Sequence, residues 1–256
     1  STLGDVDGDG TLDLVITGWD GSNPSATLYL GDGSGGFSEA NAGLTGASRS
    51  SSTLGDVDGD GTLDLVITGW DGSNPKTTLY LGDGSGGFSE ANAGLTGVEA
   101  SSSTLGDVDG DGTLDLVITG YDGSNPTTTL YLGDGTGGFT EANAGLTGVS
   151  RSSSTLGDVD GDGDLDLVIT GNDGSNPTAT IYENAVPPSI AVDQGGTSIS
   201  DGDTFDAGTT PEGTDLTTSF TVSNTGGADL EITSASVSNT DFFNVTPPST
   251  LPVTIP

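Results

Sequence analysis

Short runs of alternating apolar and polar residues recur along most of the chain. Residues 63–68 and 77–81 combine leucine, β-branched and tyrosine side chains with a period of two, which is typical of strands with two different faces. A short strand is expected over residues 50–55 and a weaker one over 87–91. Runs of Gly, Asp, Asn and Pro separate these segments and predict tight turns. Because no segment carries the apolar period of a helix, we predict an all-β chain.

The pattern repeats with a period of 51 residues. The repeated motif begins at Asp5, Asp56, Asp107 and Asp158. Four short antiparallel strands in each period match one blade of a β-propeller. The fourth copy diverges after Tyr182, and the two prolines at 187 and 188 are typical of a linker. We therefore predict propeller blades over residues 1–184, the last of them partial, and a linker over 185–188.

Residues 189–256 contain no repeat and have a different pattern. Apolar and polar residues alternate over 216–222, 230–237 and 242–245, and a turn is expected over 224–227. Short alternating strands of this kind are typical of an immunoglobulin-like (Ig-like) β-sandwich. The predicted fold is therefore all-β, with β-propeller blades followed by a C-terminal Ig-like sandwich.

Composition narrows the functions that this chain could have. It has 38 acidic and 3 basic residues, a formal net charge of −35, which disfavours nucleic acid and anionic lipid as partners. No apolar run is long enough for direct insertion into a membrane. Cys, Met and His are absent, so thiol nucleophiles, imidazole bases and the ligands of zinc, copper and haem are missing. We expect a protein without catalytic activity that binds a hard, oxygen-seeking cation.

The repeated motif has the spacing of a calcium loop. In the first copy, the acids at motif positions one, three, five and nine are Asp5, Asp7, Asp9 and Asp13. The carbonyl of Thr11 at position seven would add a neutral ligand, and Gly10 at position six allows the sharp turn of the loop. Calcium takes six to eight oxygen ligands in flexible geometry, and clustered carboxylates repel one another without a cation. The motif therefore predicts a Ca²⁺ site between two strands.

The later copies repeat this ligand set in register, which predicts one Ca²⁺ in each of the four repeats. Their ligands are Asp56, Asp58, Asp60, Thr62 and Asp64; Asp107, Asp109, Asp111, Thr113 and Asp115; and Asp158, Asp160, Asp162, Asp164 and Asp166. An EF-hand is excluded because its bidentate glutamate at position 12 is replaced by Ile16. A strand pattern, not a helix, also follows the motif.

The motif is followed by Leu-Asp-Leu-Val-Ile-Thr-Gly and then by Leu-Tyr-Leu-Gly-Asp-Gly-Ser-Gly-Gly-Phe. This succession resembles the FG-GAP/VCBS-type repeats of integrin-α-like β-propellers over residues 1–184. The resemblance implies blades around an axis, with calcium in the loop that joins the first two strands of each blade. The literal Phe-Gly and Gly-Ala-Pro landmarks are missing, which points to the bacterial FG-GAP-like branch.

The tail, over 188–192, 220–230 and 241–245, resembles the Ig-like module of choice-of-anchor D bacterial surface proteins. That family continues for further strands, so an incomplete sandwich is expected here. The chain opens at Ser1 within a motif copy, so we expect the natural N-terminus to lie upstream.

Closure of the propeller is an open question, because propellers usually have about four to eight blades. Three full repeats and part of a fourth leave three alternatives. The chain is a fragment of a larger protein, it is completed head-to-tail by neighbouring copies in a fibre, or it closes as a compact four-bladed ring.

An aromatic position near the end of the second strand of each repeat holds Trp19, Trp70 and Tyr121, and Asn172 takes their place in the fourth copy. These rings could contact glycans, or they could pack on the neighbouring hairpin, which we prefer because Asn172 breaks the series. Asp20 and its copies fit a hairpin turn better than a second metal site.

Together, these features predict a non-enzymatic, calcium-binding structural or adhesion protein. Millimolar calcium outside the cell would fill the loops, so we expect an extracellular or bacterial cell-surface location. The expected partners are other copies of the chain in a filament, or other surface proteins and glycans. The alternative is a carbohydrate-binding, lectin-like propeller in which Trp19, Trp70 and Tyr121 contact the sugar.

Overall fold

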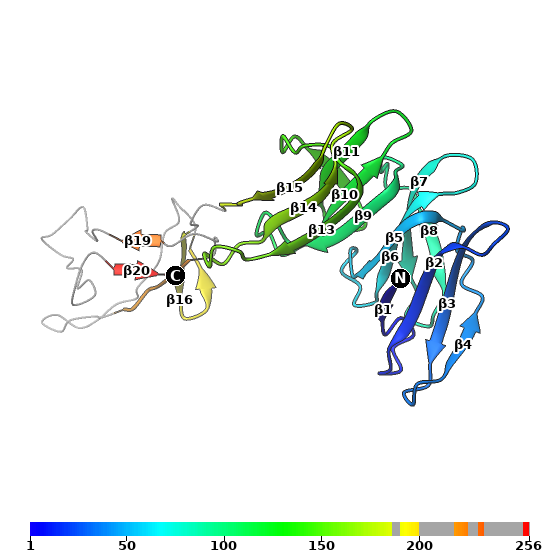
Figure 1. Cartoon of the computed structure of the whole chain (residues 1–256). Helices are drawn as coiled ribbons and strands as arrows, with labels where there is room; N and C mark the ends of the chain where they lie inside the picture. The colour runs from blue at the N-terminus through cyan, green and yellow to red at the C-terminus, as the bar shows by residue number, and fades with distance from the viewer. Residues whose placement is uncertain (186–189, 200–217, 225–229, 233–252, 256) are drawn as a thin grey trace, which may run out of the picture. The chain divides into compact units, whose positions relative to one another are not determined.

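The computed structural model describes residues 1–185, 190–199, 218–224, 230–232 and 253–255 (Figure 1). Within these residues, all regular secondary structure is β-strand, which confirms the all-β prediction. The described part contains no helix long and apolar enough to cross a membrane. The chain divides into two compact units, residues 1–159 with 165–184, and residues 160–164 with 185–256.

The repeats form successive antiparallel sheets whose strands are adjacent in chain order. The first sheet has β1 (Thr2–Gly4), β2 (Asp13–Trp19), β3 (Pro24–Gly31) and β4 (Phe37–Ala40). The second has β5 (Ser48–Gly55), β6 (Asp64–Trp70), β7 (Pro75–Gly82) and β8 (Phe88–Ala91). The third has β9 (Glu99–Gly106), β10 (Asp115–Tyr121), β11 (Pro126–Gly133) and β12 (Phe139–Ala142). The fourth has three strands, β13 (Ser150–Gly157), β14 (Asp166–Asn172) and β15 (Pro177–Tyr182).

These sheets confirm the strands expected over 50–55, 63–68, 77–81 and 87–91, each of which falls mainly within β5, β6, β7 or β8. Burial along the strands shows how the sheets pack. The first six residues of β6 and of β10 are buried on both faces, whereas β2 is buried mainly on one. The middle repeats are therefore covered by neighbours on both sides.

The hydrophobic cores lie between consecutive repeats. In the first, Val15 and Leu28 from one sheet pack with Leu65, Ile67 and Tyr80 from the next. The same arrangement follows between the second and third repeats and between the third and fourth. The second and third repeats therefore contribute one face to the core on either side of them.

The glycine that ends the first strand of a sheet allows the next sheet to approach closely. A Cβ on Gly4 would lie 2.8 Å from a methyl carbon of both Leu54 and Leu63. Gly55 and Gly106 meet the corresponding leucines of the third and fourth repeats in the same way. The repeated glycine is thus part of the contact between sheets.

The first strands of the sheets lie beside one another and are joined through hydroxyl groups. Extensive contacts link β5 to β9 and β9 to β13, and none of comparable extent links the first sheet to the fourth in the described residues. Ser103 donates from both N and Oγ to Ser51 Oγ, each at 3.2 Å, and Ser154 contacts Ser102 in the same way. The described sheets are blade-like, but they do not form a closed propeller.

The second unit contains strands in two small antiparallel sheets. One has β16 (Ile190–Gln194) between β17 (Thr197–Ser198) and β18 (Thr221–Asn224), and the other pairs β19 (Leu230–Ile232) with β20 (Val253–Ile255). The strand expected over 242–245, the turn over 225–227 and the linker residues 186–188 lie outside the described residues. The Ig-like sandwich therefore stays a prediction.

Candidate metal centre

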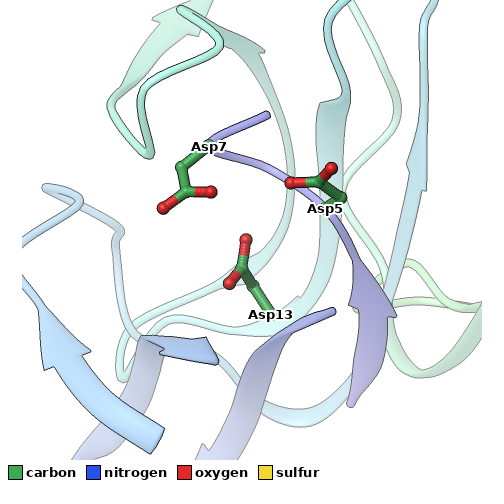
Figure 2. Close-up of side chains that lie close together, drawn as sticks. All are labelled: Asp5, Asp7 and Asp13. Atoms are coloured by element: carbon green, nitrogen blue, oxygen red, sulfur yellow. The ribbon is translucent and has the colours of Figure 1, made fainter. Parts of the chain in front are cut away.

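Three carboxylates of each repeated loop converge on one point. In the first repeat these are Asp5, Asp7 and Asp13, with ligand oxygens that all lie within 4.8 Å of one another. Figure 2 shows the three side chains turned toward a common space, two from the loop and one from the start of β2. The equivalent groups are Asp56, Asp58 and Asp64; Asp107, Asp109 and Asp115; and Asp158, Asp160 and Asp166. The structure thus brings together motif positions one, three and nine in every copy.

The aspartate at position nine is the most buried member of each cluster. Asp13 is 1% exposed and accepts hydrogen bonds on both oxygens, from Val6 N at 2.8 Å and from Gly31 N at 2.9 Å. These donors belong to the loop itself and to the end of β3. The carboxylate therefore fixes the loop to its own sheet while one side of it faces the cluster.

Burial and like charges act on the second and third copies of this residue. Burial raises the pKa of Asp64, and the carboxylates of Asp58 and Asp56 raise it further, although hydrogen bonds from Gly82 and Val57 oppose the change. Burial also raises the pKa of Asp115, with Asp109 as the main like charge. A cation among these oxygens would remove the repulsion that disfavours their ionised form.

The surroundings of Asp5 test whether the carboxylates of the cluster suit a cation. Its Oδ2 accepts from Gly10 N at 2.9 Å, but its Oδ1 is buried and has no hydrogen-bond partner among the described residues. A buried carboxylate oxygen without a donor is costly, and a bound cation would satisfy it. Clustered carboxylate oxygens are ligands that calcium prefers, so this set fits Ca²⁺.

The acid at position five lies outside each cluster. Asp9 Oδ1 accepts from Thr11 N at 2.8 Å and from Thr11 Oγ1 at 2.6 Å, so it closes a turn within the loop. The hydrogen bond from the Thr11 hydroxyl is the main cause that lowers the pKa of Asp9. Asp60 and Asp111 make the same contacts with Thr62 and Thr113.

The fourth loop replaces this threonine with Asp164. Its N–H donates to Asp162 Oδ1 at 3.1 Å, so the backbone part of the turn persists without the hydroxyl. The backbone N–H groups at position seven of the first, second and third loops donate the same hydrogen bond to the acid at position five. The carbonyl oxygens at position seven stay predicted ligands.

A hairpin from the following repeat covers each of the first two loops, which the sequence did not indicate. Gly86 N, between β7 and β8, donates to Val6 O at 3.3 Å. Gly137 N, between β11 and β12, donates to Val57 O at 3.1 Å. The loop of one repeat therefore contacts the next repeat directly.

Among the residues that the structure describes, no such hairpin follows β15 in the fourth repeat, and Asn184 takes its place. The Asn184 side chain donates from Nδ2 to Val108 O at 2.5 Å, and its N–H donates to Asp166 Oδ1 at 2.8 Å. One residue thus covers the third loop and holds the last aspartate of the fourth. Asn184 was missed because a single asparagine at a repeat boundary carries no recognisable pattern.

The other candidate residues lie away from the clusters. Asp20 Oδ1 accepts from Ser22 N at 2.7 Å and from Asn23 N at 2.8 Å, which agrees with a turn. Trp19 ends β2 and is 60% exposed, whereas Trp70 and Tyr121 are half-buried at the same place in β6 and β10. In the described residues, these loops contain no metal-binding group of acids.

The family follows from a comparison with family models. The FG-GAP-like repeat model matches residues 5–67, 56–118 and 107–169, which together cover more than half of the chain. The chain belongs to the FG-GAP-like repeat family. Each match runs from the first aspartate of one loop into the second strand of the next repeat, so the FG-GAP-like unit spans the contact between two sheets.

Curated proteins provide no significant match to the chain. Among solved structures, the crystal structure of the V. cholerae biofilm matrix protein Bap1 is similar, with 18% sequence identity and a TM-score of 0.34. The similarity covers 74% of this FG-GAP-like chain and 40% of the Bap1 chain. The chain therefore spans less than half the length of that protein.

Proposed function

We propose that the chain is a non-enzymatic, calcium-binding structural or adhesion protein of the extracellular space or the bacterial cell surface. The observation that carries the proposal is the cluster of three carboxylates, which recurs in all four repeats. In the first repeat, Asp5 Oδ1 is also buried without a hydrogen-bond partner among the described residues. FG-GAP-like membership supports calcium as the ion. Millimolar calcium, which would fill loops of modest affinity, is found outside cells.

In this proposal, the ion would bind the aspartates at positions one, three and nine, completed by the acid at position five and the carbonyl at position seven. Its chemistry would be that of a hard cation that neutralises charge. The protein residues do the rest, because Asp13 fixes the loop to β3 and Gly86 joins it to the next sheet. Calcium would therefore stabilise both the loop and the junction between repeats.

We keep the domain division as part of the proposal, with FG-GAP-like blades over 1–184, a linker over 185–188 and an Ig-like sandwich over 189–256. A chain made of a rigid repeat array and a sandwich suits the spacing and display of surfaces between cells or in a matrix. The partners that we propose are other copies of the chain, other surface proteins and glycans.

Calcium binding can be tested by isothermal titration of the full chain after treatment with a chelator. We expect binding at the four loops with Ca²⁺ preferred over Mg²⁺, because the loops are rich in carboxylates and Ca²⁺ accepts more variable coordination by oxygen than Mg²⁺ does. Asp58→Ala should remove one site and leave the others. No heat of binding with Ca²⁺ at any loop would contradict the proposal.

A carbohydrate-binding function is the second candidate, and the exposure of Trp19 favours it, since an exposed indole can stack on a sugar. A glycan array separates the two functions. Strong binding that Trp19→Ala and Trp70→Ala abolish, while Tyr29→Phe does not, would favour the lectin. Calcium-dependent stability without glycan binding would favour the structural role.

A further inference from the structure

In the second and third repeats, the hairpin between the third and fourth strands contacts two metal loops. We name these hairpins, residues 83–87 and 134–138, the bridging hairpins. The start of each one is bonded to the loop of its own repeat, and its tip is bonded to the loop of the preceding repeat. All of these contacts lie within the first compact unit. Each bridging hairpin therefore links two predicted calcium sites.

The bridging hairpin of the second repeat is held at its start by the second loop. Gly82 N, at the end of β7, donates to Asp64 Oδ1 at 2.9 Å, and Thr62 Oγ1 donates to Gly82 O at 3.3 Å. A Cβ on Gly84 would lie 2.8 Å from the methyl carbon of Thr62, so the hairpin backbone packs directly on that residue. Asp64 and the Thr62 carbonyl are predicted ligands of the second loop. A change in the position of these ligands therefore acts directly on the hairpin.

The tip of the same hairpin holds the first loop at the residue between two of its ligands. Gly86 N donates to Val6 O at 3.3 Å, while Val6 N donates to Asp13 Oδ2 at 2.8 Å. Val6 is buried and lies between Asp5 and Asp7 in the chain. A Cβ on Gly86 would lie 3.7 Å from the Cβ of Asp7. The hairpin of the second repeat therefore helps to position the aspartates of the first loop.

Hydrogen bonds within the hairpin keep its start and its tip in a fixed relation. Asp83 Oδ1 accepts from Ser85 N and Ser85 Oγ, both at 2.8 Å, and from Gly87 N at 2.9 Å. Asp83 N also donates to Gly87 O at 3.0 Å. Asp83 lies outside the carboxylate clusters that the described residues form in these two loops. Its task is to hold the shape of the hairpin.

The bridging hairpin of the third repeat makes the same two sets of contacts. At its start, Gly133 N donates to Asp115 Oδ1 at 2.9 Å, and at its tip Gly137 N donates to Val57 O at 3.1 Å. One hairpin thus joins the second loop to the first, and the next hairpin joins it to the third. Because the arrangement occurs at two junctions, it is a property of the repeat.

We propose that the bridging hairpins couple neighbouring calcium sites, so that filling one loop raises the affinity of the loop before it. The aspartate and threonine of a filled loop would hold the start of the hairpin in place, and the tip would then fix the preceding loop. Ordering of the hairpin would be completed once for two sites. Coupling is reciprocal, so each of the two sites raises the affinity of the other by the same factor. This inference rests on the proposed calcium binding and adds its regulation.

Electrostatic repulsion alone would produce coupling of the opposite sign. A divalent cation in one loop makes the neighbouring loop less attractive to a second cation, because like charges repel. At an ionic strength of about 0.15 M this repulsion is screened over about 8 Å, whereas a contact through the backbone is not. Positive coupling at this ionic strength therefore indicates coupling through the hairpin.

NMR titration of the full chain, labelled with nitrogen-15 at valine, can follow the loops one by one. The amides of Val6, Val57 and Val108 each donate to the aspartate at position nine of their own loop at 2.8 Å, so they report on the first, second and third loops. Asp58→Ala removes the second site. The calcium affinity reported by Val6 should then fall at least about fivefold, although the first loop itself is unchanged.

Asp83→Ala tests whether the hairpin carries this effect, because it removes the internal hydrogen bonds and changes no predicted ligand. In the Asp83→Ala background, Asp58→Ala should change the affinity reported by Val6 by less than about twofold. Asp71→Ala is the matched control. It removes the same charge from the other hairpin of the same repeat, where Asp71 accepts from Ser73 N and Asn74 N. In that background the fivefold effect should persist.

The third repeat provides an independent pair of variants. Asp109→Ala should lower the affinity reported by Val57 at least about fivefold in the wild type and less than about twofold in Asp134→Ala. Asp134 holds its hairpin with the same hydrogen bonds as Asp83. Asp122→Ala is the control here, since Asp122 closes the other hairpin of that repeat. A folding defect in one hairpin variant therefore leaves the other pair to decide.

The outcomes separate this inference from the proposed function. If Val6 reports calcium binding of the same affinity with and without Asp58→Ala, the coupling is overturned and calcium binding stands. An equal effect of Asp58→Ala in the wild type and in Asp83→Ala would also overturn it, because the hairpin would not be the route. If the amides of Val6, Val57 and Val108 do not respond to calcium, the proposed function is contradicted, and the coupling with it.

Discussion

At the scale of single residues, the aspartates of one loop have two different tasks. Asp64 is buried and accepts from Val57 N at 2.8 Å and from Gly82 N at 2.9 Å, so it holds two backbone groups with or without an ion. Asp58 accepts from Asp60 N at 3.2 Å on the exposed side of the loop, and from no other donor within the described residues. Its main partner would be the metal.

This difference predicts different effects of Asp64→Ala and Asp58→Ala. Asp64→Ala should lower the free energy of unfolding by about 3 kcal/mol even in chelator, because it leaves two N–H groups unpaired. Asp58→Ala should lower stability in calcium and have little effect in chelator, or increase it slightly, since one repelling charge is removed. Urea unfolding of both variants with and without calcium measures this, and equal losses under both conditions for Asp58→Ala would contradict a metal-binding task.

The hairpin aspartates predict a dependence on pH. The Asn74 amide, followed by that of Ser73, lowers the pKa of Asp71. A carboxylate whose pKa is lowered by folding stabilises the protein above its unfolded pKa of about 3.9, and this stability is lost as the pH falls through the folded value. NMR titration of the Asp71 carboxyl carbon should give a midpoint below that of a model peptide. A midpoint at or above the peptide value would contradict the turn geometry.

The sequence predicts the metal cluster only in part, for a physical reason. Asp5, Asp7 and Asp13 occupy motif positions one, three and nine, and their oxygens lie close together as the calcium-loop spacing predicts. Asp9 has the same spacing, but it lies next to an amide and a hydroxyl of Thr11 that compete for its carboxylate. Local competition between hydrogen bonds cannot be inferred from spacing.

At the scale of strands and sheets, tyrosine hydroxyls join neighbouring repeats. Thr45 N, in the segment between β4 and β5, donates to Tyr80 Oη at 2.9 Å, and Tyr80 itself is 2% exposed. Thr96 and Thr147 make the same bond to Tyr131 and Tyr182. Each of these hydrogen bonds joins the segment that links two consecutive sheets to the second of those sheets.

Tyr80→Phe should therefore lower the free energy of unfolding by about 1–2 kcal/mol, because the Thr45 N–H loses its partner. Tyr29→Phe is the control, since the Tyr29 hydroxyl has no such bond within the described residues. Urea unfolding of the two variants provides the comparison. Equal stability of Tyr80→Phe and the wild type would show that the bond contributes nothing.

Glycines at strand ends give a second prediction about the sheets. A Cβ on Gly133, at the end of β11, would lie 2.2 Å from the Leu114 carbonyl oxygen, whereas a Cβ on Gly18 in β2 has no atom within 4 Å. Gly133→Ala must move backbone and should cost about 1–3 kcal/mol. Gly18→Ala should be nearly neutral. Thermal unfolding of both variants tests this, and a neutral Gly133→Ala would contradict the close approach.

The strands themselves were predictable because alternation directly reflects the two faces of a sheet. Other features of the sheets were not. Arg49, Ala100 and Arg151 have positive φ angles of 49°, 50° and 48° in stretches where the first strand shifts register against the second. Nothing in these residue types favours that conformation, so the register shift could not be predicted from them.

At the scale of the whole molecule, the repeats form a linear array in which each core is shared by two neighbours. The period of 51 residues predicted the blade-like sheets, but closure depends on how sheets are rotated relative to one another, which no single repeat encodes. The described sheets do not close on themselves. Within the described residues, each sheet instead shares a core with its neighbours in chain order.

Electrostatic repulsion opposes the packing of the repeats on one another. A net charge of −35 repels itself, and much of it lies in loops that face the next repeat. Calcium bound in a loop, as we propose, would neutralise that charge at the junction between two sheets. When the free calcium concentration is about 100 times the dissociation constant of a site, binding at that site adds about 2.7 kcal/mol to the free energy of unfolding.

We propose that divalent cations hold the acidic loops, and through them the sheets, in place. The most direct test is the thermal unfolding of the full chain, recorded in calcium and again after a chelator has removed it. We predict a melting temperature that is clearly higher in calcium, that falls with the chelator and that recovers when calcium is restored. An unchanged melting temperature under all three conditions would contradict the account.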